Sequence, residues 1–164
     1  MSKLFFILLI AVGYFLPLSA FSQAKTHTFE EIDSLQQTEK RNIAVFIHTD
    51  WCKFCNTMKN TTFKDENIAQ LLNENFWFAD LDAEETKDIT FSGHTFKYKP
   101  TGRKTGIHEL AEQLGTIDGK IAFPTLCILN SNHEIIFQYG QFLSSEGLQK
   151  VLTEIVNNTI AIKY

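Results

Sequence analysis

The chain has 164 residues, a formal net charge of −4, three cysteines and fifteen phenylalanines. The mildly acidic balance argues against a general nucleic-acid binder. Three cysteines are too few, and odd in number, for a scaffold held together by disulfides.

Residues 1–24 are interpreted as a secretory signal peptide. Lys3 supplies a positive start, an apolar run covers Leu4–Leu16, and Ser22-Gln23-Ala24 offers small residues at a cleavage point. The run is interrupted by Pro17 and is shorter than the roughly 20 residues that a membrane-spanning helix needs. We therefore expect export, and a bacterial periplasm is the expected location because residues 161–164 show no endoplasmic-reticulum retention signal. Membrane attachment is expected only if the leader is not cleaved.

Residues 25–164 are predicted to form one domain in which helices and strands first alternate. A hairpin and a helix come last. This order predicts an α/β fold whose sheet is mostly covered by helices and has one antiparallel end. Predicted helices cover 29–40, 52 to beyond 58, 65–73, 107–114 and 144–156, and predicted strands cover 43–47, 76–81, 125–129 and 134–139.

Residues 83–119 form a longer excursion between these elements. Within it, Ile89–Phe91 and Thr95–Tyr98 are predicted to pair as a hairpin around Ser92-Gly93-His94. Basic and aromatic residues interleave here, as they do in some nucleic-acid binders, but an exported acidic domain argues against that partner. The excursion is either a solvated hairpin or a flap that docks a partner.

The motif that carries chemistry is Trp51-Cys52-Lys53-Phe54-Cys55, set directly after the strand over 43–47. A helix N-terminus lowers the pKa of a cysteine such as Cys52, and the neighbouring Lys53 adds positive charge. The spacing of three puts Cys55 on the same helical face, within reach of a mixed disulfide on Cys52. The pair is predicted to cycle between dithiol and disulfide. The alternatives are half of a zinc site, for which a second ligand pair is missing, and a permanent structural disulfide.

An apolar strand, Trp-Cys-x-x-Cys, a helix and a later Phe123-Pro124-Thr125 in this order resemble the thioredoxin superfamily. The run over 50–55, followed by Thr62-Phe63-Lys64-Asp65, is similar to the periplasmic C-terminal domain of the DsbD electron conductor and to its soluble relatives. The resemblance implies a thioredoxin fold, with a central mixed sheet flanked by helices. It also makes 83–119 an insertion after the strand that follows the active-site helix.

The resemblance also implies a role for each matching residue. Cys52 is the attacking cysteine, Cys55 the resolving cysteine and Trp51 the flanking aromatic residue. Pro124 is a cis-proline facing the pair, although it also reads as a strand-start proline, and the backbone of Phe123 pairs with an incoming extended peptide.

The implied function is a periplasmic thiol-disulfide oxidoreductase without cofactor or metal. It exchanges protein disulfides or dithiols, more as reductant than oxidant, and is recharged by an upstream redox partner. A non-enzymatic binding module with a structural disulfide, and a disulfide oxidant or isomerase, stay open as alternatives.

One position departs from cytoplasmic thioredoxin, because Phe46 replaces the buried aspartate six residues before the first cysteine. His48 lies on the same strand face by alternation, and Asp80 ends the neighbouring strand. Each is a candidate to accept the proton of Cys55, the alternatives being a core histidine and a solvated carboxylate. Cys127, inside an apolar strand, is expected to be a packed thiol.

Overall fold

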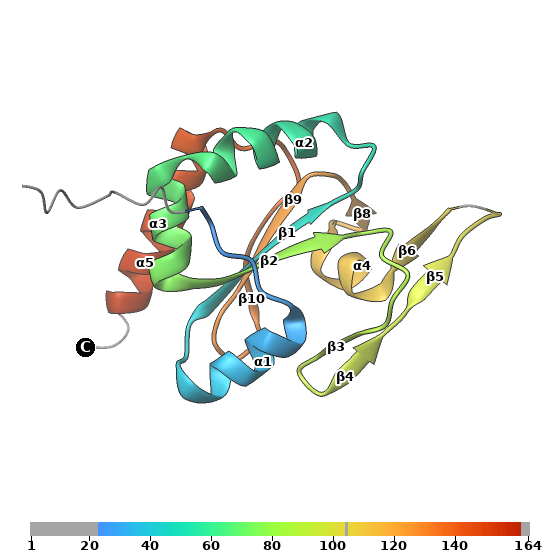
Figure 1. The fold of residues 1–164 in the computed structure, drawn as a ribbon, viewed down its shortest axis with the longest axis horizontal. Coiled ribbons are helices and arrows are strands. Elements are labelled where there is room, and N and C mark those ends of the chain that lie inside the picture. The colour runs from blue at the N-terminus through green and yellow to red at the C-terminus, as the bar shows by residue number, and fades with distance from the viewer. Residues whose placement is uncertain (1–22, 104, 162–164) are drawn as a thin grey trace, which may run out of the picture.

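The computed structural model describes residues 23–103 and 105–161, so the predicted signal peptide lies almost wholly outside the described residues. A four-stranded sheet in the order β10-β9-β1-β2 forms the centre (Figure 1). Strand β1 (Asn42–His48) runs parallel to β2 (Phe76–Asp82) and antiparallel to β9 (Thr125–Leu129), which pairs with β10 (Ile135–Tyr139). The sheet is mixed with one antiparallel end, as predicted.

Helices cover both faces of the sheet, and the alternation of side chains along β1 supplies two cores. Ile43, Val45 and Ile47 enter the core that contains residues of α1 and α4, whereas Ala44 and Phe46 enter the core built with α2, α3 and α5. The helices are α1 (Phe29–Thr38), α2 (Lys53–Asn60), α3 (Glu66–Asn75), α4 (Glu109–Gly115) and α5 (Ser145–Ala161), with a 3₁₀ turn, η1, at Thr62–Lys64. In the described part of the chain, no helix combines the length and apolar character needed to cross a membrane.

Local side-chain caps explain where two of these helices begin. Thr28 accepts a hydrogen bond from the N–H of Glu31 while the Glu31 carboxylate accepts one from the N–H of Thr28, which is the capping box that the sequence suggests. The Asp65 carboxylate accepts from two N–H groups at the start of α3. These caps satisfy backbone N–H groups in the first turns of α1 and α3, two helices that flank the sheet.

The excursion over 83–119 contains two hairpins rather than one. Strand β3 (Ile89–Phe91) pairs with β4 (His94–Phe96), and β5 (Tyr98–Pro100) pairs with β6 (Gly106–His108). Ser92 and Gly93 both have positive φ, so a two-residue turn starts the second strand at His94, one residue earlier than predicted.

The helix predicted from Ile107 begins at Glu109 instead. His108 is its N-cap, and the Nδ1 atom of that ring accepts a hydrogen bond from the N–H of Leu110. Ile107 therefore belongs to β6. A small hairpin of β7 (Thr116–Ile117) and β8 (Lys120–Ile121), which was not predicted, then leads to β9.

The β3–β4 hairpin packs on α1, so this part of the excursion is not a fully solvated hairpin, and docking of a partner by it stays a prediction. Phe91 and Phe96 are buried in the core shared with α1, and the ring of Phe91 lies 5.1 Å from that of Phe29. The N–H of Ser92 donates to Asp33 Oδ2 at 2.7 Å. Figure 1 shows β3 and β4 beside α1, away from α2. Residues 101–103, at the end of the β5–β6 hairpin, remain exposed.

Candidate active site

Cys52 and Cys55 lie at the start of α2 and are joined by a disulfide, with their Cα atoms 5.2 Å apart. Cys52 is the N-cap of the helix: its Sγ accepts a hydrogen bond from the N–H of Cys55 at 3.1 Å. Cys52 keeps 5% of its surface exposed and Cys55 keeps none. The arrangement can present the first sulfur to a partner while the second stays inside the protein.

Exposed aromatic rings surround the disulfide. Trp51 and Phe54, on either side of Cys52 in the sequence, each have 66% of their surface exposed. The ring of Trp51 lies 6.0 Å from that of Phe123, and the ring of Phe54 lies 6.2 Å from that of Phe142. Large exposed apolar groups gathered at one place are typical of surfaces that bind other proteins.

The loop before β9 meets the cysteine motif through the contact between Trp51 and Phe123. The peptide bond between Phe123 and Pro124 is cis, as the thioredoxin resemblance implies, and Pro124 is buried. The predicted residues Trp51, Phe123 and Pro124 are thus brought to one place. Phe142, from the loop between β10 and α5, was not predicted, and no local pattern marks it.

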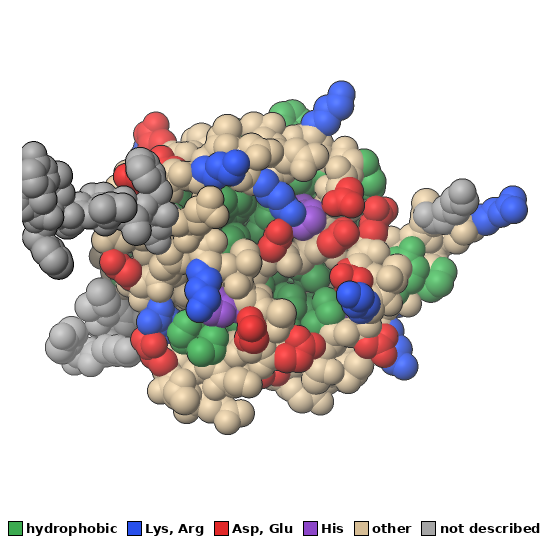
Figure 2. Space-filling model, in the orientation of Figure 1, with side chains coloured by type: hydrophobic (Ala, Val, Ile, Leu, Met, Phe, Trp, Pro, Cys, Tyr) green, Lys and Arg blue, Asp and Glu red, His purple; other side chains and the backbone are tan. Residues whose placement is uncertain are grey.

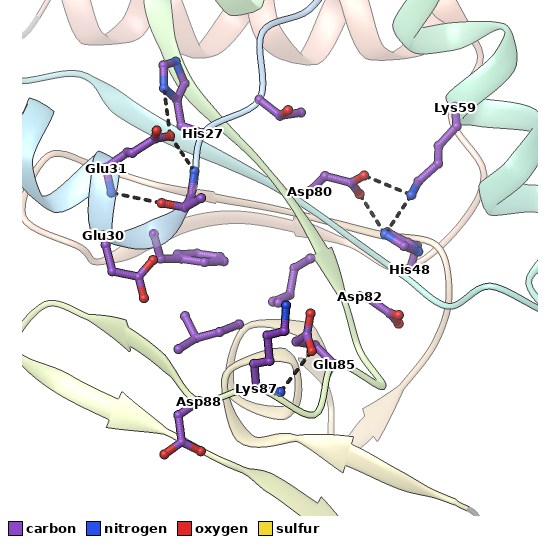
Figure 3. A pocket seen from close by; sticks show the side chains of 15 residues that line it. His27, Glu30, Glu31, His48, Lys59, Asp80, Asp82, Glu85, Lys87 and Asp88 are labelled. Carbon is purple, nitrogen blue, oxygen red and sulfur yellow. Dashed lines mark hydrogen bonds and ion pairs between the residues drawn. The ribbon is translucent and has the colours of Figure 1, made fainter.

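His48, Asp80 and Lys59 form a closed cluster on the α2 face of the sheet (Figure 3). His48 Nε2 lies 2.8 Å from Asp80 Oδ1 and 2.8 Å from Lys59 Nζ, and Lys59 Nζ lies 2.9 Å from Asp80 Oδ2. His48 and Asp80, predicted as alternative proton acceptors, are therefore partners. The parallel register of β1 and β2 places Asp80 opposite Phe46 and so brings it next to His48, two residues further on.

The electrostatics of the cluster favour an ionised carboxylate. Burial by itself would raise the pKa of Asp80, but the hydrogen bonds and electrostatic attraction of the neighbouring His48 and Lys59 outweigh it and hold that pKa below its ordinary value. The Asp80 carboxylate is consequently a weak base near neutral pH. It serves better to stabilise a cation beside it than to take a proton itself.

Lys59 is the member of the cluster that sequence reasoning missed. The signal was present: Lys59 follows Cys55 by four residues on α2, and this spacing puts both side chains on one face of the helix. A lysine on the face that carries a buried cysteine is half-buried against the sheet. It therefore needs a partner, and Asp80 is that partner.

Cys127 lies on the other face of the sheet from the disulfide. It is fully buried in the core that contains residues of α1 and α4, whereas Cys52 and Cys55 belong to the core of α2, α3 and α5. Burial raises the pKa of the Cys127 thiol to about 12. The expectation of a packed thiol is confirmed, and this thiol is poorly placed to exchange with the pair.

No group of three or more His, Cys, Asp or Glu side chains is arranged to hold a metal ion among residues 23–103 and 105–161.

Comparison with known families gives one model that matches nearly the whole described chain. Residues 26–158 match the family Thioredox_DsbH, described as a protein of unknown function, DUF255. Spermatogenesis-associated protein 20 of Mus musculus is 32% identical over 59 residues, which are 35% of this chain. The match spans only 8% of the length of that mouse protein.

Solved structures of thioredoxin-fold proteins superpose on the chain. A DsbH oxidoreductase, 15% identical, gives a TM-score of 0.56 with 82% of this chain and 85% of that chain covered. A thioredoxin from Thermus thermophilus, 18% identical, gives a TM-score of 0.58 with 82% and 88% covered. At these identities the likeness establishes the thioredoxin fold.

Proposed function

The chain belongs to the Thioredox_DsbH family within the thioredoxin superfamily, and we propose that it is an exported thiol-disulfide oxidoreductase that reduces protein disulfides through Cys52 and Cys55. One observation carries the proposal. The disulfide lies at the N-terminus of α2 with Cys52 Sγ as the helix cap, so a thiolate formed there gains the hydrogen bond of the Cys55 N–H and the positive end of the helix dipole.

The reaction consists of two exchanges. The Cys52 thiolate attacks one sulfur of a client disulfide, which forms a mixed disulfide and releases the other client sulfur with the bonding electron pair. Cys55, after losing its proton, attacks Cys52 Sγ, and the client leaves as a second thiolate. The client gains two electrons, and the protein is left with the Cys52–Cys55 disulfide. A reducing partner must then supply two electrons to restore the dithiol.

The exposed rings of Trp51 and Phe54, with the half-buried ring of Phe123 beside Trp51, favour a protein client over a small thiol. Apolar residues next to the client's cysteine gain contact area on these rings, and aromatic surfaces bind such residues without a large entropy cost. The backbone of Phe123, beside the cis peptide bond, is suited to pair with an extended client segment.

Two considerations support export and the reducing direction. The leader over residues 1–24 has the pattern of a secretory signal, which makes the periplasm the proposed location. The motif is similar to that of the DsbD C-terminal domain, which passes electrons outward. The activity itself is supported by the name of the DsbH structure that superposes on this chain, which is called an oxidoreductase.

Reduction of insulin disulfides in dithiothreitol tests the activity. We expect the protein to accelerate this reduction, Cys52→Ser to abolish it, and Cys55→Ser to accumulate a mixed disulfide with the client. A disulfide that resists dithiothreitol would favour a binding module instead. The reduction potential decides the direction. A value of about −270 mV, as for thioredoxin, supports a reductant, and a value of about −120 mV, as for a strong disulfide oxidant, supports an oxidant.

A further inference from the structure

The cluster of His48, Asp80 and Lys59 adjoins Phe46, the position at which this chain lacks a buried acid. Phe46 stands where thioredoxin carries that acid, and Asp80 is the register partner of Phe46 on β2. The ring of His48 stacks on that of Phe46, with centroids 5.6 Å apart and an interplanar angle of 24°. Phe46 and Cys55 belong to one core cluster. The titratable groups are therefore gathered on the face that carries the resolving cysteine.

The hydrogen bonds of the cluster are satisfied in two protonation states of one nitrogen. His48 Nε2 has a donor and an acceptor at the same distance, Lys59 Nζ and Asp80 Oδ1, both at 2.8 Å. A ring nitrogen that carries hydrogen donates to Asp80, and one without hydrogen accepts from Lys59. Asp80 Oδ2 keeps its ion pair with Lys59 in both cases. One proton can thus enter or leave without a backbone movement.

The cluster also reaches water. A cleft of about 540 Å³ is lined on one side by His48, Lys59 and Asp80, and elsewhere by residues 26–31, by Glu85 and by residues 87–89 (Figure 3). In Figure 2, acidic and basic side chains lie interspersed around the middle of this face. Beyond the cluster, the titratable and charged groups that line the cleft are Asp82 on β2, Glu85, Lys87 and Asp88 on the following loop, and His27, Glu30 and Glu31 at the N-terminal end.

We propose that this cluster accepts the proton of Cys55 when the mixed disulfide is resolved, with His48 as the base and Lys59 as a positioning residue. The inference rests on the proposed function. Cys55 Sγ loses its proton to the imidazole and attacks Cys52 Sγ. The bond between Cys52 and the client then breaks with its electron pair on the client sulfur, and the imidazole passes the proton to water in the cleft.

Lys59 and Asp80 have opposite effects on the positive charge that forms when the His48 ring accepts a proton. The Lys59 ammonium, 2.8 Å from His48 Nε2, repels a positive charge that forms on the ring. The Asp80 carboxylate stabilises the imidazolium once it forms. Removal of either partner should therefore move the pH dependence of resolution, with opposite signs.

The test uses 5,5′-dithiobis(2-nitrobenzoate) and the reduced protein. Attack by Cys52 releases one nitrothiobenzoate, and resolution by Cys55 releases a second, so absorbance separates the two steps. We expect Lys59→Met to raise the midpoint of the rate–pH profile of the second release by about one unit, which slows this step about tenfold below the midpoint. Asp80→Asn should lower the midpoint by about one unit and reduce the plateau rate.

The controls separate a proton-transfer role from a structural one. Lys59→Arg keeps the charge and should retain the wild-type midpoint. Lys150→Met removes an exposed lysine that pairs with Glu146 on α5, outside the pockets that the cluster lines, and should change nothing. The first release should keep its rate in every variant.

Superimposable second-release profiles for wild type and Lys59→Met would overturn the inference, as would shifts of equal sign in the Lys59 and Asp80 variants. A wild-type protein that gives no second release would instead overturn the proposed function.

Discussion

The backbone N–H of Cys55 donates a hydrogen bond to Sγ of Cys52 across 3.1 Å, so the first sulfur of the pair is itself the cap of α2. In the reduced protein this contact favours a thiolate at Cys52. The second sulfur is buried by the same turn of helix. The two cysteines therefore differ in access and in the contacts of their sulfurs, although they lie only three residues apart.

Alkylation should show this difference. In the reduced protein at about pH 7, iodoacetamide should modify Cys52 about tenfold faster than free cysteine, because a helix N-terminus increases the thiolate fraction. Cys55 should remain unmodified in the folded state. Peptide mass spectrometry after a short pulse measures both. Equal labelling of the two cysteines would contradict the inferred asymmetry.

Asp80→Asn should destabilise the protein in a pH-dependent way. Burial opposes ionisation of Asp80, but the contacts with His48 and Lys59 outweigh burial and lower its pKa in the folded state. The carboxylate therefore contributes stability above about pH 4, the ordinary value, and this contribution is lost as the pH falls through the folded pKa. Because about a third of the side chain is exposed, we expect a loss of only about 1 kcal/mol at pH 7.

Urea denaturation at about pH 7 and about pH 2 measures this loss. The difference between wild type and Asp80→Asn should vanish at the lower pH, since both side chains are then neutral. Asp118→Asn, at an exposed carboxylate, serves as the matched control and should have little effect at either pH. A pH-independent loss would mean that packing rather than charge sets the effect.

Cys127 should be inert in the folded protein. Its thiol is fully buried, and its pKa of about 12 leaves almost no thiolate near neutral pH. The oxidised protein should therefore show no titratable thiol when native and one thiol per chain after unfolding. Cys127→Ala should cost about 1 kcal/mol of stability through the lost sulfur contacts and leave insulin reduction intact. A loss of activity without unfolding would contradict a purely packing role.

The two hairpins of the insertion should respond differently to deletion. Removal of residues 92–104 eliminates the buried Phe96 and the contact between Ser92 and Asp33, so we expect a loss of several kcal/mol and reduced activity toward every substrate. Replacement of residues 101–105 by two glycines removes an exposed turn and should leave the unfolding midpoint within about 2 °C of wild type. Thermal denaturation compares the two. A stable protein lacking 92–104 that still reduces small disulfides would instead favour the flap that docks a partner.

Phe142 should contribute to client binding through its contact with Phe54. Phe142→Ala should raise the KM for a protein disulfide about fivefold, since an aromatic contact is worth about 1 kcal/mol, and should leave the reaction with a small disulfide unchanged. Tyr139→Ala is the matched control, because Tyr139 is exposed to a similar extent, 36% against 38%. An equal effect of both substitutions would indicate a general loss of apolar surface.

Much of the fold could be predicted because its signals are local. The unbroken apolar run over 43–47 marks a covered strand, and the spacing of Cys52 and Cys55 marks one helical face, since each pattern depends only on residues within two turns or one strand. The capping box of Thr28 and Glu31 is equally local. The cysteine pair, its position at a helix start and the order of the helices and strands along the chain were accordingly available from the sequence.

The surroundings of the disulfide were decided by tertiary structure. His48, Lys59 and Asp80 meet only because parallel pairing sets the register of β1 and β2 and because α2 packs across them. Phe142 reaches Phe54 through contacts between segments far apart in the chain. Such contacts depend on long-range pairing and packing, which no short sequence pattern encodes. The sequence alone thus determines that a cysteine pair lies at the start of a helix, and the folded chain decides which aromatic rings gather around the pair and which titratable groups meet on that face of the sheet.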